Sequence, residues 1–154
     1  MHLFVYGTLM DPDIREIVFG TPDWRVDGVP ARLAGFRRDT ILGGRAPVLV
    51  PHKHRAVDGQ VLQGLDEVAL ARVVHFEGVA RYRLAEVRVA PADRGEALHA
   101  AAFLPTEDVR AARRDWDLAT WRRRHKAEFL RRARRHMAGY PARLAVRVAT
   151  GQPA

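Results

Sequence analysis

The first twenty residues contain the feature that most constrains the fold, a short apolar strand that runs through a glycine turn into a helix. Residues 3–6 are apolar or aromatic and favour β-structure, and Gly7 ends the run. Asp11 is a good N-cap, and Pro12 suits the first helical position because an N–H would have no partner there. Gly20 is a typical stop signal. We predict a strand, a tight loop and a short helix.

The predicted loop also has the properties of a binding site. It leaves backbone N–H groups pointing outward beside a helix N-terminus, where they can hold a carboxylate or a developing oxyanion. An ordinary strand-to-helix turn would have the same sequence, so this stretch alone leaves both interpretations open. A second feature, at Glu77, favours the binding site.

Composition restricts the possible chemistry. The chain has 154 residues, enough for one domain with a single core, and it contains no Cys, Ser or Asn. Serine and cysteine nucleophiles, disulfides and thiolate metal sites are therefore excluded. Hydrolytic or transfer chemistry must depend on a carboxylate, His, Thr, Tyr or Lys, and we expect neither a metal nor another cofactor.

The sequence contains no sign of a membrane segment or a leader. No apolar run approaches the roughly 20 residues that span a bilayer. The N-terminus also lacks the basic region and the long apolar stretch of a signal peptide. We therefore expect a cytoplasmic protein without a membrane partner.

The positive charge is concentrated in one segment. Residues 110–136 hold eleven Lys and Arg against three acids and account for the net charge of +8, while the rest of the chain is neutral. A basic face can bind nucleic acid, anionic lipid or an acidic partner. Alternatively, Arg serves only as a solubilising residue, because 24 of the 26 basic residues are Arg. We favour the solubilising role and keep nucleic acid as the weaker alternative.

Short strands outnumber helices in the first two thirds of the chain. After a loop at 21–28, we expect a helix over 67–76, between a capping Asp66 and Gly78, and six strands: 29–33, 37–41, 47–51, 57–65, 82–89 and 97–104. His52 and His54 are expected in a solvated loop. This mixed order favours an α+β fold around a strongly curved sheet or small barrel.

The C-terminal third is expected to be mainly helical. Thr106 is predicted to cap a short helix, and a longer helix is predicted from about Asp115 or Asp117 to the break at Pro141. Apolar residues at three- and four-residue steps predict one packed face on it: Leu118, Trp121, Phe129, Ala133 and Met137. His125 lies on this face, and we interpret it as a packed residue. A last edge strand is expected at 144–148.

Glu77 lies in the most apolar surroundings of any acid in the chain. It follows Phe76 and precedes Gly78 at a predicted helix C-terminus. The negative end of the helix dipole and partial burial both disfavour the ionised carboxyl. We therefore expect a pKa raised towards the range that suits a general acid or base. An exposed glutamate without a special role is the alternative.

Two motifs, in this order, resemble those of the gamma-glutamylcyclotransferase-like family. They are Tyr-Gly-Thr-Leu-Met at 6–10 and Phe-Glu-Gly at 76–78, followed by an alternating strand that begins with Tyr-Arg at 82–83. Between them, Pro47 and the Gly-Gln-Val at 59–61 fall where the family has its middle strands. The resemblance covers roughly residues 2–104.

The resemblance implies an α+β fold, a small mixed β-barrel flanked by helices, with one cavity. It implies that the loop holds a γ-glutamyl group through Tyr6, Gly7, Thr8 and Leu9, and that Glu77 is the catalytic residue. The implied reaction is intramolecular: the substrate's α-amino group attacks its own γ-carbonyl, which forms 5-oxoproline and releases an amine or peptide. The enzyme then needs no nucleophile of its own.

The domain organisation expected is one domain over 1–154, with a core at 2–104 and a basic helical extension at 106–140. This extension could cover the barrel mouth, form a dimer face or bind an anion. Two functional alternatives stay open. A non-catalytic binding protein would use the basic helix, and a related lyase would use the same site to remove a γ-glutamyl protecting group in biosynthesis.

Overall fold

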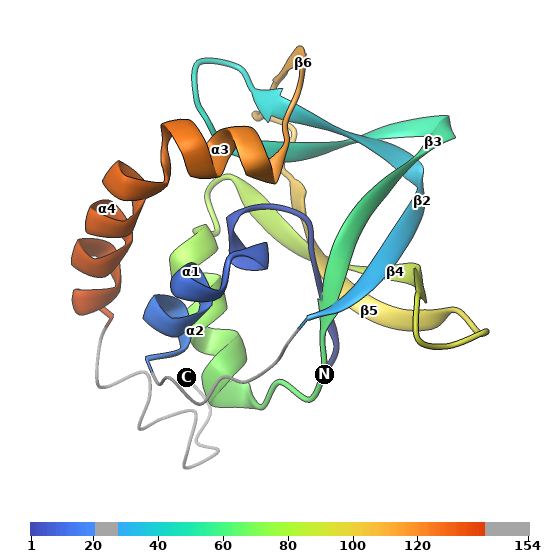
Figure 1. Ribbon diagram of the computed structural model, residues 1–154, viewed down its shortest axis with the longest axis horizontal. Coiled ribbons are helices and arrows are strands. Elements are labelled where there is room, and N and C mark those ends of the chain that lie inside the picture. The colour runs from blue at the N-terminus through green and yellow to red at the C-terminus, as the bar shows by residue number, and fades with distance from the viewer. Residues whose placement is uncertain (21–27, 141–154) are drawn as a thin grey trace.

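The computed structural model describes residues 1–20 and 28–140. In this part of the chain, five strands close into a barrel and four α-helices pack against one side of it (Figure 1). The strands are β1 (Leu3–Val5), β2 (Val29–Ile41), β3 (Pro47–Leu62), β4 (Tyr82–Pro91), β5 (Leu98–Pro105) and a short additional β6 (Ala111–Asp115). The helices are α1 (Pro12–Phe19), α2 (Glu67–Glu77), α3 (Leu118–Arg124) and α4 (Lys126–Ala138), with a 3-10 turn, η1 (Thr8–Met10), before α1.

The barrel closes because β2 and β3 pair with each other. The strand order is β3–β1–β5–β4–β2, and β6 adds to β2 outside the closed ring. β1 runs parallel to β5, whereas the other pairs are antiparallel. The predicted α+β fold, a small mixed β-barrel flanked by helices, is confirmed.

β1 lies between two apolar clusters. Side chains alternate along a strand, so Phe4 and Tyr6 join the cluster inside the barrel, whereas Leu3 and Val5 join the cluster between the barrel and the helices. None of these four residues is more than 6% exposed. The end of β1 is thereby fixed at the side of the barrel that the helices cover.

The predicted helix ends are confirmed for α1 and α2. Asp11 caps α1, and Gly20 ends it in the left-handed conformation with φ +76°. Asp66 caps α2 by accepting a hydrogen bond from the Ala69 N–H at 2.8 Å, and Gly78 follows its last residue. None of the helices in the described ranges is long and apolar enough to cross a membrane.

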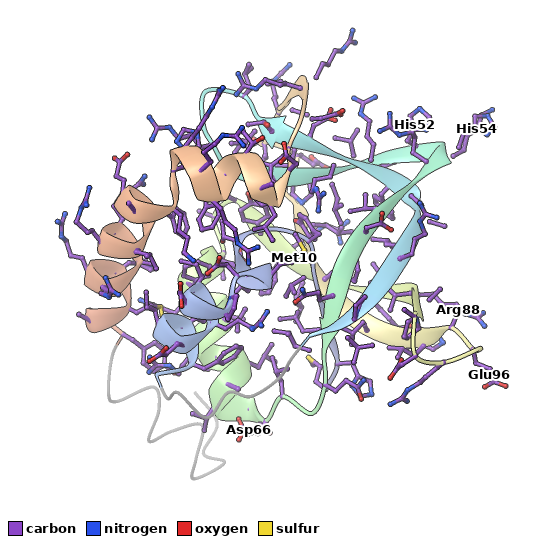
Figure 2. All side chains as sticks on the ribbon, in the orientation of Figure 1. Met10, His52, His54, Asp66, Arg88 and Glu96 are labelled. Carbon is purple, nitrogen blue, oxygen red and sulfur yellow. The ribbon has the colours of Figure 1, made fainter. Side chains whose placement is uncertain are left out.

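β2 and β3 are each continuous, although the sequence predicts a break in both. The register between them shifts at Gly35 (φ +85°), and residues 52–55 of β3 bulge opposite it. The prediction of a separate loop for His52 and His54 is therefore wrong. Both side chains project outward from β3, on the side of the barrel away from α1, α2 and α4 (Figure 2).

The C-terminal segment differs from the prediction in two places. The short helix expected at Thr106 is a turn, closed by a hydrogen bond from the Val109 N–H to the Thr106 carbonyl at 3.1 Å, and the chain then forms β6. The single long helix is two, because α3 ends and α4 begins at His125 (Figure 1). The loop predicted at 21–28 falls, except for its last residue, outside the described residues, as does the strand predicted at 144–148.

Asp11 connects three helices through its carboxylate. It is fully buried, and it accepts hydrogen bonds from the Asp13 N–H at 3.0 Å, Arg122 Nε at 2.7 Å and Lys126 Nζ at 3.0 Å. Burial alone would raise the pKa of Asp11, but the hydrogen bonds and charges of the two cations outweigh it and lower the pKa. The N-terminus of α1 is thereby held against α3 and α4.

We expect Asp11→Asn to lower the free energy of unfolding by about 2 kcal/mol at neutral pH, measured by urea denaturation. Asparagine is also a good N-cap, so this variant isolates the loss of the two ion pairs. Because folding lowers the pKa of Asp11, its contribution should be lost as the pH falls through the folded-state pKa, and the difference from wild type should shrink in acid.

Asp108→Asn is the matched control. Asp108 is exposed and forms no ion pair with any described residue, so we expect a change within about 0.5 kcal/mol. Equal effects of the two substitutions would show that the Asp11 ion pairs do not stabilise the helix arrangement.

Candidate active site

A cavity of about 560 Å³ opens where the end of β1 meets α2 and α4. Its lining includes the end of β1, the turn η1, the starts of β3 and β4, part of β5, the end of α2 and one face of α4. All five residues that the sequence singles out lie around this one cavity: Tyr6, Gly7, Thr8, Leu9 and Glu77. Residues about seventy positions apart are thus brought together.

The carbonyl groups of residues 6–10 all accept hydrogen bonds from the protein. Those of Gly7 and Thr8 accept from the N–H groups at the end of the turn. Arg38 Nη1 donates to the first carbonyl of the five at 2.8 Å, and Arg15 Nη1 donates to the last two at 3.1 and 3.0 Å. These two arginines belong to β2 and α1, and no local pattern in the sequence indicates their role.

Three N–H groups of the same loop are free. Within the described chain, those of Gly7, Thr8 and Leu9 donate to no protein acceptor. All five carbonyls of the loop already accept hydrogen bonds, whereas these three amides have no acceptor. The loop can therefore offer a bound group hydrogen-bond donors. Such a set of donors suits a carboxylate or an oxyanion.

Gly7 lies in close contact with Pro47. A Cβ at position 7 would lie 2.6 Å from Pro47 Cγ, nearer than side chains approach one another. The glycine is therefore required by the neighbouring proline ring, which itself lines the cavity.

Glu77 is the last residue of α2, and its half-buried side chain lines the cavity. Burial raises the pKa of its carboxyl to about 7, in the direction expected from the sequence. Among the described residues it has no hydrogen-bond or ion-pair partner. A carboxyl that is unpaired and close to half-ionised at neutral pH can both take up and release a proton.

Two tyrosines of the cavity wall hold the barrel strands together. The Tyr6 hydroxyl donates to the Phe103 carbonyl, and the Tyr82 hydroxyl donates to the Pro47 carbonyl at 3.2 Å. Burial, with a smaller effect of the Glu77 charge, raises the pKa of Tyr82 to about 12 and that of Tyr6 well above its usual range. Both phenols therefore stay neutral donors to backbone carbonyls.

α4 forms the wall of the cavity beside α2. The Phe129 ring lies edge-on to the Phe76 ring, with centroids 6.2 Å apart. The rings of His75 and His136 stack with centroids at 4.5 Å, and the Nε2 of each lies 3.3 and 2.9 Å from the other's backbone carbonyl. Of the three roles left open for the basic extension, the structure shows that α4 covers part of the barrel mouth.

The described residues include no group of three or more His, Cys, Asp and Glu that could hold a metal ion. The polar groups around the cavity include the carboxyl of Glu77, the imidazole of His136, the three loop amides and the guanidinium groups of Arg81, Arg132 and Arg135.

Comparisons with known proteins agree with this arrangement. A family model, "Gamma-glutamyl cyclotransferase, AIG2-like", matches residues 3–123. AIG2-like protein C of Arabidopsis thaliana is 32% identical over 129 residues, which cover 83% of this chain and 73% of that protein.

Solved structures show the same fold. A solution structure of an Arabidopsis thaliana protein has a TM-score of 0.64 and 26% identity, and the match covers 87% of this chain and 79% of that one. A structure named gamma-glutamyl cyclotransferase has a TM-score of 0.57 and 16% identity, with coverage of 99% and 88%. The chain belongs to the gamma-glutamyl cyclotransferase, AIG2-like family.

Proposed function

We propose that the protein is a cyclotransferase that releases 5-oxoproline from a γ-glutamyl amine or peptide. One observation carries this proposal: the unpaired carboxyl of Glu77, with a pKa of about 7, lines the same cavity as residues 7–9, whose backbone amides donate to no acceptor in the described chain. Family membership supports an enzyme of the cyclotransferase type.

The reaction needs one group that acts first as a base and then as an acid. The Glu77 carboxylate takes a proton from the substrate's α-ammonium group, and the amine then attacks the γ-carbonyl carbon. A bond forms between that nitrogen and that carbon, and the carbonyl oxygen becomes an oxyanion. Glu77 returns the proton to the leaving nitrogen as the old C–N bond breaks. The ring nitrogen still carries a second proton and gives it to the departing amine, so that 5-oxoproline and the ammonium form of the released amine result.

The loop amides complement the charge that develops in this reaction. The N–H groups of Gly7, Thr8 and Leu9 are the donors for the oxyanion, and they need no reorganisation because the carbonyls of the turn are already bonded. A positioned proton-transfer group contributes roughly 10²–10⁴-fold to rate. An oxyanion donor contributes roughly 10²–10³-fold. The attacking amine is already part of the substrate, which adds proximity.

We expect Glu77→Gln to lower kcat for 5-oxoproline release by about 10²–10⁴-fold, because glutamine cannot take up the proton. The measurement is 5-oxoproline formed from a panel of γ-glutamyl amino acids and amines, with circular dichroism to verify the fold. Glu107→Gln, at an exposed position, is the control and should keep wild-type turnover. Normal turnover by the Glu77 variant would remove this residue from the mechanism.

The same substitution should stabilise the protein at high pH. The carboxyl titrates near 4.5 in an unfolded chain and at about 7 in the folded one, so the folded state binds the proton more tightly. Stability should therefore fall as the pH rises from about 4.5 to 7, and Glu77→Gln should remove this loss. At pH 8 we expect the variant to be more stable by up to about 3 kcal/mol. A stability difference independent of pH, in urea titrations, would show that the carboxyl is not buried as described.

We expect Gly7→Ala to lower kcat/KM by about 10²-fold, because the proline ring cannot yield and the loop amides must move. The cost in stability should be about 1–3 kcal/mol. Pro47→Ala removes the ring carbon in closest contact, so the double variant should recover part of both losses. Additive losses in this double-mutant cycle would contradict the proposed contact.

A further inference from the structure

Three arginines line the mouth of the cavity, and we call them the arginine rim: Arg81, Arg132 and Arg135. Arg81 lies just before β4, and the other two lie on α4. All three are exposed, whereas Tyr6 and Tyr82 in the same lining are only 6% and 8% exposed. The cavity is thus closed by buried aromatic residues at its inner end and is strongly basic at its outer end.

The rim arginines have no partner that accounts for their charge. Within the described ranges they form no ion pair, in contrast to Arg122, which pairs with Asp11 at 2.7 Å. Glu77 is the only acid in the described lining of the cavity, and it forms no ion pair with the rim. The positive charge of the rim is therefore available to a ligand.

The reaction geometry determines which part of a substrate meets the rim. A substrate whose γ-carbonyl lies at the loop amides and Glu77 places its γ-glutamyl part among the buried residues. Its leaving group must then extend towards the exposed mouth. Guanidinium groups bind carboxylates through paired, charge-assisted hydrogen bonds.

We propose that the leaving group of the substrate carries a carboxylate, as an amino acid or a peptide does, and that the arginine rim binds it. Neutral or cationic amines are then the poorer leaving groups. This inference rests on the proposed cyclotransferase function. Two of the three rim residues lie beyond residue 123, where the match to the family model ends, so this selectivity belongs to the C-terminal helix of this chain.

Adjacent arginines on α4 provide matched controls. Arg132 and Arg135 are three residues apart and line the cavity. Arg131 is an exposed residue of the same helix that does not line it, and Arg134 lines a different hollow, beside Asp13 and Glu16. Replacing both Arg131 and Arg134 therefore removes the same two charges from the helix as replacing Arg132 and Arg135, without changing the rim.

The test compares kcat/KM for γ-glutamyl-alanine and γ-glutamyl-alaninamide, which differ only in the leaving-group carboxylate. We expect wild type to prefer the acid by about tenfold at low salt, and added NaCl to reduce this ratio. The double variant Arg132→Gln/Arg135→Gln should bring the ratio close to one. The control double variant Arg131→Gln/Arg134→Gln should leave the ratio as in wild type.

Each other outcome has a distinct meaning. A wild-type ratio of one would overturn the inference and leave the proposed function standing. An equal loss for both substrates in the double variant would also overturn it, because the rim would then bind a group common to both, such as the α-carboxylate of the γ-glutamyl part. If neither compound yields 5-oxoproline, the proposed function fails, and the inference fails with it.

Discussion

The structure depends on how the carbonyl groups of one loop are satisfied. Buried or half-buried carbonyls must accept hydrogen bonds. In the loop after β1 they accept them from Arg38, Arg15 and the end of the turn, and the amide groups of residues 7–9 stay free. Arg38 also donates to the carbonyls of Asp58 and Trp116, both at 3.0 Å, and Arg15 donates to Gln60 Oε1 at 3.0 Å. The conformation of the loop is therefore coupled to β2, β3 and α1.

Features set by short-range contacts were predicted well from the sequence. A capping carboxylate bonds to an N–H two or three residues away, which is why Asp11 and Asp66 marked the starts of α1 and α2. The apolar residues that precede Glu77 at the end of α2 likewise predicted the direction of its pKa shift, because neighbours in sequence are also close in space. The loop at Gly7 was identified because its signals are also local: an apolar strand comes before it and a capped helix follows it.

Features set by distant partners could not be read in the same way. The continuity of β2 and β3 depends on their mutual pairing, so a glycine at position 35 marked a bulge and not a break. The apolar stripe of the C-terminal segment showed that one face is packed, but not that the chain bends at His125. The stripe also could not show that Phe129 reaches Phe76, which brings α4 to the cavity.

The proposed reaction sets two opposing requirements for charge in the cavity. The Glu77 carboxyl must keep a raised pKa, and positive charge must attract an anionic substrate. An arginine beside Glu77 would favour the carboxylate and lower its pKa, and a carboxylate that is too weak a base could not take a proton from an ammonium group. Burial raises the pKa instead, at a cost in stability that many active sites carry. In the proposed reaction, positive charge that attracts an anionic substrate must then lie apart from the Glu77 carboxyl. Exposed arginines at the mouth meet this condition, because solvent weakens their effect on a buried group.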